Sequence, residues 1–255
     1  MSFLDADPTD ILFASNLNAL ENVRHAFFGR SWGRAGLSPL QDEPDSAPWR
    51  ERIGSFFGVP SPQVLCCRQV HSPTVVYVSE PWSFREAPAA DGMVTDRPGL
   101  VLGIMTADCA PVLLADAEAG VIGAAHAGWR GALGGILGNV LEAMEKRGAR
   151  RKNIVAALGP CIAQESYEVD KSFSVPFFAQ NSGNELFFKQ SIKKDKYLFD
   201  LSGYIVSQLN VFGVGNVLPS LGDTYADPKR FFSHRYATQR HKAREGSLVS
   251  GLSMH

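Results

Sequence analysis

The middle of the chain limits the possible folds most strongly. Residues 100–105, 111–115 and 121–127 are short apolar runs typical of buried strands, and residues 116–120 predict a hairpin turn between the last two. A helix is expected over 131–147, where apolar residues recur at helical spacing. Strands joined by a hairpin are antiparallel, whereas parallel strands need a long crossover. This mixture predicts an α+β fold with mixed sheets instead of wound βαβ units.

The remaining pattern adds shorter elements on both sides of this region. We expect strands over 23–29, 63–71, 74–79 and 154–158, and short helices over 10–20, from Trp49 to Gly58 and after a cap at Asp200. A strand over 63–71 would place Gln69 and His71 on one face, because side chains alternate along a strand. Residues 31–48 are expected to form a surface loop, and residues 231–252 short strands with a basic loop.

Composition excludes several classes of protein. The 25 basic and 26 acidic side chains give a net charge of −1, which offers no electrostatic surface for nucleic acid. No apolar run reaches the roughly 18 residues that a membrane span needs, and the start MSFLDADPTD lacks the features of a secretory signal. Four cysteines are too few for a disulfide scaffold. We therefore expect a cytoplasmic protein without nucleic-acid or membrane partners.

Three residues are candidates for chemistry because they lie at expected strand ends, where side chains converge on one rim. They are His71, Cys109 and His126, and small residues such as Ala124 and Gly128 surround two of them in the sequence. One thiolate and two imidazoles suit Zn²⁺ and leave a fourth position for water or substrate. The same residues also suit a cysteine nucleophile with a histidine base. The sequence does not separate a metal-bound thiolate from a catalytic one.

Five segments carry a resemblance to a known family. The chain resembles the YfiH family, also called the peptidoglycan editing factor or laccase-domain family and including FAMIN-like purine nucleoside phosphorylases, over about residues 23–252. The segments are RQVH (68–71), ADGMVTDRPGLVLGIMTADCAPVLL (90–114), GAAHAGWRG (123–131), LGPCIAQESYEV (158–169) and FFSHR (231–235).

The resemblance implies one catalytic domain over 1–255, with a variable N-terminal part of about residues 1–62. The implied fold is a layered sandwich with mixed sheets, similar to a cysteine-dependent deamidating toxin. His71, Cys109 and His126 are implied as catalytic residues and zinc ligands. The implied reactions are phosphorolysis of adenosine, inosine, guanosine and methylthioadenosine, and deamination of adenosine. Older family descriptions imply a copper-dependent polyphenol oxidase instead.

The residues distinguish some of these reactions. A multicopper site needs on the order of ten histidines, because copper relies on imidazole ligands, and the chain has six. Deamination of adenosine matches known zinc chemistry. Phosphorolysis needs an anion site, because phosphate is a substrate. Arginine matches phosphate geometry, although each candidate could instead be a surface charge. The candidates are Arg30, Arg130, Arg235 and Arg244.

Further residues are candidates for substrate contact or support of the site. Gln69 could orient substrate or make a structural hydrogen bond, and Asp91 could contact substrate, support a ligand or only form a turn with Gly92. His234 could line the pocket. Asp108 could orient the backbone beside Cys109.

The chain also departs from the family pattern. The run FFGRSWGRAGLSP lacks the usual paired glycines, and Trp49 and Tyr236 stand where asparagine and arginine are usual. These departures leave the expected ligands intact but affect regions expected to shape the pocket. Two alternatives therefore stay open: a cysteine hydrolase or amidase that edits peptidoglycan precursors with Cys109 as nucleophile, and a non-catalytic metal-binding protein. A homodimer is the default oligomeric state.

Overall fold

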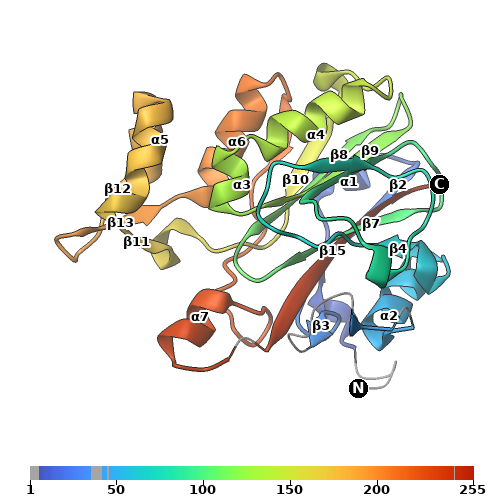
Figure 1. Ribbon diagram of the computed structural model, residues 1–255, viewed down its shortest axis with the longest axis horizontal. Coiled ribbons are helices and arrows are strands. Elements are labelled where there is room, and N and C mark those ends of the chain that lie inside the picture. The colour runs from blue at the N-terminus through green and yellow to red at the C-terminus, as the bar shows by residue number, and fades with distance from the viewer. Residues whose placement is uncertain (1–5, 36–41, 45, 244) are drawn as a thin grey trace.

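The structure is a computed structural model that describes residues 6–35, 42–44, 46–243 and 245–255. Two six-stranded sheets form its centre, with helices against their outer faces (Figure 1). Each sheet contains both parallel and antiparallel neighbours. The predicted α+β fold with mixed, layered sheets is therefore confirmed.

The first sheet joins both ends of the chain. Its order is β1 (Ile11–Leu12), β2 (Val23–Phe28), β15 (Gly246–Met254), β7 (Val101–Thr106) and β4 (Val64–Leu65), and β3 (Arg34–Ala35) pairs with the start of β15. Only β4 and β7 are parallel among these pairs. Helix α2 (Pro48–Phe57) packs on the outer face through Trp49, Ile53 and Phe57.

The second sheet contains the predicted hairpin. Its order is β14 (Asn216–Leu218), β10 (Val155–Leu158), β8 (Ala110–Asp116), β9 (Val121–Ala127), β6 (Gly92–Thr95) and β5 (Val75–Tyr77). Strands β8 and β9 are antiparallel along their whole length. The hairpin prediction is therefore confirmed.

Successive side chains of β8 point to opposite faces of the sheet, and this alternation explains the two core layers. Leu113 and Ala115 belong to the core between the two sheets, together with Leu102 of β7. Val112 and Leu114 belong to the core under the helices α4 (Ile136–Glu145) and α6 (Leu201–Val211). A strand buried on both faces reads as a continuous apolar run, and this one does.

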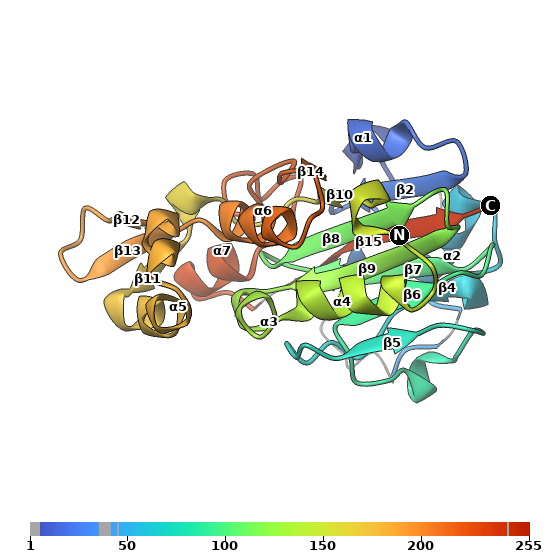
Figure 2. The same ribbon diagram turned by 90° about the horizontal axis from the view of Figure 1, so that it is seen from above.

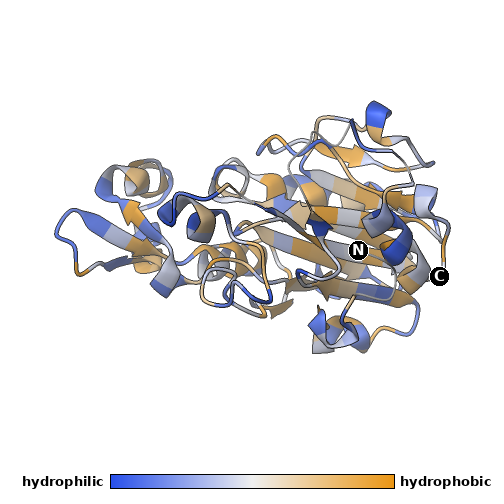
Figure 3. Ribbon diagram, turned by 90° about the horizontal axis from the view of Figure 1, so that it is seen from below, coloured by the Kyte–Doolittle hydropathy of each residue, from blue (hydrophilic) through white to orange (hydrophobic). Residues whose placement is uncertain are grey.

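A smaller lobe projects from one end of this sandwich (Figure 2). It consists of β11 (Glu168–Asp170), β12 (Phe188–Gln190), β13 (Lys196–Phe199) and α5 (Val175–Gln180). The rings of Phe173, Phe177 and Phe199 contact one another inside it. The tip of the hairpin between β12 and β13 is mostly hydrophilic but carries the exposed Ile192, whereas apolar residues concentrate on the central strands (Figure 3).

Several predicted elements are wrong in their extent. The single helix expected over 131–147 is two helices, α3 (Trp129–Leu133) and α4, because the glycine pair 134–135 interrupts it and Gly135 has a φ of +95°. The strand expected over 63–71 is only β4, after which the chain turns irregularly. The segment 231–252 contains the helix α7 (His234–Gln239) and most of the long strand β15 instead of short strands. The helix expected over 10–20 is only α1 (Ser15–Asn18), which follows β1.

Local signals at helix ends were more reliable. Gly58 ends α2 with a φ of +74°, and the Asp200 carboxylate caps α6 by accepting the N–H of Gly203. Part of the loop predicted over 31–48 lies outside the described residues. Within the described part of the chain, no helix has the length and apolarity required to cross a bilayer.

Candidate metal centre

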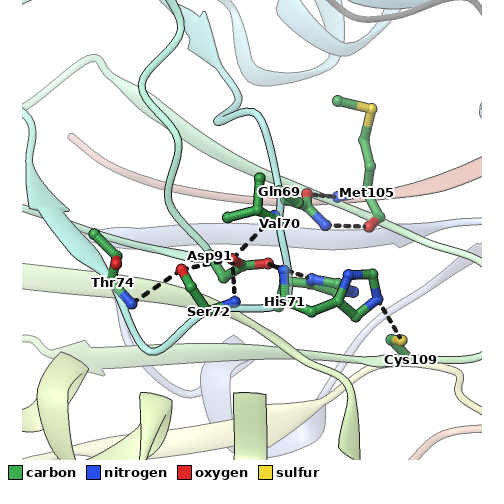
Figure 4. A network of polar contacts seen from close by, with 9 residues as sticks. Gln69, Val70, His71, Ser72, Thr74, Asp91, Met105 and Cys109 are labelled. Atoms are coloured by element: carbon green, nitrogen blue, oxygen red, sulfur yellow. Dashed lines mark hydrogen bonds and ion pairs between the residues drawn. The ribbon is translucent and has the colours of Figure 1, made fainter. Parts of the chain in front are cut away.

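The structure brings His71, Cys109 and His126 together. Their ligand atoms all lie within 4.8 Å of one another. Cys109 Sγ is 3.9 Å from His71 Nε2 (Figure 4). The imidazole rings of His71 and His126 meet edge to face. His71 is exposed, Cys109 is half-buried and His126 is buried, so the cluster is open to solvent on the side of His71.

Strand pairing explains how two of these residues meet. The register of the β8–β9 hairpin places Pro111 opposite His126. Cys109 lies just before β8, at the same end of the hairpin. His71 reaches the cluster differently, because it lies in an irregular turn after β4 and has a φ of +60°. The expectation that all three lie on regular strand ends is therefore correct for Cys109 and His126 and wrong for His71.

Asp91 holds this turn and the buried histidine together. Its Oδ1 accepts the N–H of His71 at 2.9 Å and contacts His126 Nδ1 at 2.8 Å. Its Oδ2 accepts the N–H groups of Val70 at 3.1 Å and Ser72 at 2.7 Å, and the Ser72 hydroxyl at 3.0 Å. Figure 4 shows the carboxylate at the centre of this network.

The structure places Asp91 behind the candidate ligands and not on the cavity surface. Its side chain is fully buried and is absent from the residues that line the neighbouring cavity. Burial opposes its charge, but the hydrogen bonds from His126 and the backbone lower the pKa of this carboxyl to about 2. It therefore remains a carboxylate that orients His126 through Nδ1 and leaves Nε2 for a ligand.

Electrostatics favour a thiolate at Cys109. Burial raises the pKa of this thiol, but the neighbouring His126 and His71 outweigh burial and lower the pKa to about 6. Burial likewise lowers the pKa of His126, but Cys109 and Asp91 outweigh it and raise the pKa to about 9. The other three cysteines are buried, and burial raises the pKa of each thiol above its ordinary value.

These residues fit a metal ion. Two imidazole nitrogens and one thiolate within 4.8 Å form a donor set that transition metals accept. The backbone packs tightly against the donors, since a Cβ atom at Gly128 would lie 2.7 Å from Cys109 Sγ and 3.2 Å from His71 Cδ2. The cluster could therefore bind a metal through His71 Nε2, Cys109 Sγ and His126 Nε2.

A cavity of about 740 Å³ lies beside the cluster. All three candidate ligands line it, together with the arginines Arg34, Arg68, Arg130 and Arg235. Arg130 and Arg235 were expected from the sequence. Arg34 and Arg68 were missed, although Arg68 begins the RQVH segment that also contains His71.

The remaining predicted residues have different surroundings. Gln69 lines the cavity, but its amide accepts the Met105 N–H at 2.8 Å and donates to the Met105 carbonyl at 2.7 Å. His234 lines the cavity and is exposed. Arg30 pairs with Glu245 at 2.6 Å and lines a second cavity that none of the three candidate ligands lines. Arg244 lies outside the described residues.

Asp108 supports the backbone on the other side of Cys109. Its carboxylate accepts the Thr224 hydroxyl at 2.7 Å and the Arg235 N–H at 2.6 Å. Arg235 in turn donates to the Glu168 carbonyl at 2.6 Å. Asp108 therefore ties the turn that carries Cys109 to the start of α7.

Comparison with known sequences relates the chain to a family of enzymes. A family model described as multi-copper polyphenol oxidoreductase laccase matches residues 38–255. A purine nucleoside phosphorylase of Deinococcus radiodurans is 39% identical over 223 residues, which cover 84% of this chain and 83% of that protein. A purine nucleoside phosphorylase of Rickettsia conorii is 37% identical over 191 residues, which cover 75% of this chain and 78% of that protein.

Solved structures agree with this relation. A Neisseria meningitidis protein of the DUF152 family is similar with a TM-score of 0.77 and 29% identity, over 92% of this chain and 95% of that one. YfiH of Bacillus licheniformis shares the fold with a TM-score of 0.83, over 96% of each chain at 24% identity. Because a family model and a relative of 39% identity both match most of its length, the chain belongs to the YfiH family of multi-copper polyphenol oxidoreductase laccase-like proteins.

Proposed function

We propose that this protein is a zinc-dependent purine nucleoside phosphorylase that also deaminates adenosine. The observation that carries the proposal is the cluster of His71, Cys109 and His126, oriented by Asp91, at the wall of a cavity of about 740 Å³ with four arginines. The names of the relatives from Deinococcus and Rickettsia support the nucleoside substrate.

The donor set suits a catalytic zinc ion. His71, Cys109 and His126 would supply three ligands and leave one position open, which is the usual arrangement of a catalytic zinc site. When bound, zinc supplies Lewis-acid chemistry that activates water or a substrate oxygen near neutral pH. A multicopper oxidase needs several metal sites, and the described residues offer this one cluster. Copper at this single site remains the alternative metal.

The arginines support phosphate binding. Arg130 is exposed and stacks over Trp129, while Arg235 lies over Tyr167, so each guanidinium is presented on an aromatic ring. In phosphorolysis a phosphate oxygen forms a bond to C1′ of the ribose as the bond from C1′ to the base breaks. The electron pair of that bond leaves with the base, which takes up a proton. Arginines that hold the phosphate dianion beside the sugar would bring the reactants together.

The same cavity suits the second reaction. In deamination, the oxygen of water bonds to C6 of adenine and the amino group leaves as ammonia. Burial raises the pKa of Tyr167, so its phenol stays protonated and can donate a hydrogen bond to substrate. Adenosine, inosine, guanosine and methylthioadenosine are the proposed nucleosides. Action in the cytoplasm and a homodimeric state stay predictions.

A cysteine hydrolase is the second candidate. The observation that favours it is the lowered pKa of Cys109 beside His71, because a thiolate next to an imidazole is the arrangement of a cysteine nucleophile and its base. Such an enzyme would be an amidase that edits peptidoglycan precursors. It would keep its activity when the metal is removed.

The test combines metal analysis of the purified native protein with a chromatographic assay on adenosine, with and without phosphate. We expect about one zinc ion per chain, adenine only when phosphate is present, and inosine in both conditions. His71→Ala should lose the metal and both products, whereas His255→Ala at an exposed position should keep them. Turnover that survives chelation but not Cys109→Ala would favour the cysteine hydrolase. If the metal analysis finds copper instead of zinc, the proposed metal changes to copper.

A further inference from the structure

His234 is an exposed histidine in the wall of the site cavity. It is the first residue of α7 and lines the cavity together with the three candidate ligands. Its carbonyl accepts the Thr238 hydroxyl at 2.8 Å, but no hydrogen bond or ion pair within the described residues holds its imidazole. Both ring nitrogens are therefore available to a molecule bound in the cavity.

The backbone around His234 is fixed to the turn that carries Cys109. Two buried phenylalanines lie just before the helix, and Ala107 packs against the cluster that they form. The residue after His234, Arg235, donates its N–H to the Asp108 carboxylate at 2.6 Å. Ala107 and Asp108 come directly before Cys109 in the chain. The start of α7 therefore lies beside the candidate metal centre.

Phosphorolysis needs a proton donor for the leaving base. When the bond from C1′ of the ribose to N9 of the purine breaks, its electron pair stays on the base. A proton at N7 neutralises the negative charge that would otherwise develop there, so the base leaves more readily. Histidine is the side chain that most often transfers such a proton near neutral pH, and a positioned donor typically accelerates a reaction by roughly 10²–10⁴-fold.

Most other titratable side chains that line the cavity are unsuited to this transfer. His71, Cys109 and His126 are the candidate metal ligands. Burial raises the pKa of Tyr167 and of Cys67, so both hold their protons at neutral pH. The four arginines also hold theirs, because a guanidinium does not deprotonate in proteins. None of these groups is free to give a proton to the base.

Asp108 carries the one carboxyl group among the described residues that line the cavity. One of its oxygens accepts the Thr224 hydroxyl at 2.7 Å, and the other accepts the Arg235 N–H at 2.6 Å. Both oxygens therefore hold the turn beside Cys109. His234 is the remaining titratable side chain of this cavity wall, and its imidazole has no such structural role within the described residues.

We propose that His234, as an imidazolium, donates a proton to N7 of the purine during phosphorolysis. This inference rests on the proposed phosphorylase function and adds a catalytic residue to it. A phosphate oxygen bonds to C1′ while the bond from C1′ to N9 breaks, and the electron pair of that bond stays on the base. N7 takes the proton from His234, so the base leaves as a neutral purine. The hydrogen phosphate releases its own proton to solvent, and solvent returns one proton to His234.

The test compares two nucleosides that differ in their need for a proton. The base of inosine must gain one to leave as a neutral purine. The base of 7-methylguanosine already carries a methyl group on N7 and a positive charge, so it leaves neutral without a proton. In His234→Gln, which keeps a polar side chain but cannot transfer protons, we expect kcat for inosine to fall roughly 10²–10⁴-fold. The kcat for 7-methylguanosine and the zinc content should stay close to their wild-type values.

Chemical rescue gives a second measurement that does not depend on 7-methylguanosine as a substrate. Imidazole added to His234→Ala should restore part of its kcat for inosine, because the small cation can replace the missing side chain. His241→Gln is the matched control, since His241 is exposed a few residues further along the chain and is not among the residues that line the cavity. This control should keep the wild-type kcat and show no response to imidazole.

The outcomes separate this inference from the proposed function. An unchanged kcat for inosine in His234→Gln would overturn the inference. A loss that is equal for both nucleosides and that imidazole does not restore would overturn it too, because it would indicate a structural or binding role. Each of these results requires an active wild type and leaves the phosphorylase proposal intact. A wild type that converts no nucleoside would refute the proposed function and this inference with it.

Discussion

Asp91→Asn replaces one carboxylate oxygen with an amide nitrogen in the hydrogen-bond network behind the candidate metal centre. The carboxylate accepts from His126 Nδ1 on one oxygen and from the N–H groups of Val70 and Ser72 on the other, and His71 N–H adds to the first. Every neighbour is a donor. An asparagine keeps one acceptor oxygen and presents an N–H₂ group to the remaining donors.

Either orientation of the amide is unfavourable. If the amide nitrogen faces His126, it donates to Nδ1 and shifts the proton of the ring to Nε2, which is the atom that would bind the metal. If it faces Val70 and Ser72, it opposes their N–H groups and releases the turn that positions His71. Loss of a partner behind a ligating histidine typically costs 10–100-fold in metal affinity. Breaking a buried charged network typically costs about 3–5 kcal/mol of stability.

Zinc affinity of Asp91→Asn is measured by competition with a chromophoric chelator, and stability by urea unfolding of the metal-free protein. The matched control is Asp96→Asn just after the other end of β6, where the carboxylate is 29% exposed, accepts the Tyr77 hydroxyl at 2.7 Å and pairs with Arg97 at 3.4 Å. We expect the control to keep wild-type zinc affinity. Wild-type zinc affinity in Asp91→Asn would refute the role of this carboxylate in orienting the ligands.

Three further perturbations test other parts of the structure. Gly128→Ala should lower zinc affinity in the same competition assay while circular dichroism stays unchanged, because its Cβ would lie 2.7 Å from Cys109 Sγ. His25 is buried, and burial lowers its pKa to about 4 from the ordinary 6.5, so the folded state disfavours its charge. Stability should therefore be fully present above pH 6.5 and fall by about 3 kcal/mol toward pH 4, and urea unfolding of His25→Gln should lack this part of the decline. Asp108→Asn weakens the contact with the Arg235 N–H and should raise KM for phosphate more than KM for adenosine in steady-state kinetics.

The sequence predicts the central sheet well because the required signals are local. The apolar runs and the turn at residues 116–120 specify the β8–β9 hairpin, and its register places His126 near Cys109. The helix expected over 131–147 contains two adjacent glycines, and these divide it into α3 and α4. Short strands were expected over 231–252, but the length of β15 was not predicted because the run GSLVSGLSM is rich in serine and glycine. It is a central strand of its sheet because it pairs with β2 and β7, which are distant in the sequence.

The residues of the candidate site were likewise predictable only where the sequence carries a local signal. Residue type together with the expected positions at strand ends identified His71, Cys109 and His126. Arg34 could not be found in this way, since it reaches the cavity only through the pairing of β3 with β15. Arg30 looked equivalent to Arg130 by residue type, yet it faces another cavity.

Backbone strain explains why the geometry of the site is harder to predict than its chemistry. Three non-glycine residues in the described chain have a positive φ, and two of them, His71 and Asp108, flank the metal cluster. Such conformations cost about 1–3 kcal/mol each and persist only where surrounding contacts enforce them. Asp91 enforces the first by accepting the N–H of His71 and its two neighbours, and the Asp108 carboxylate enforces the second through Thr224 and Arg235. Each compensating bond joins segments at least 19 residues apart, so no local pattern could reveal either turn.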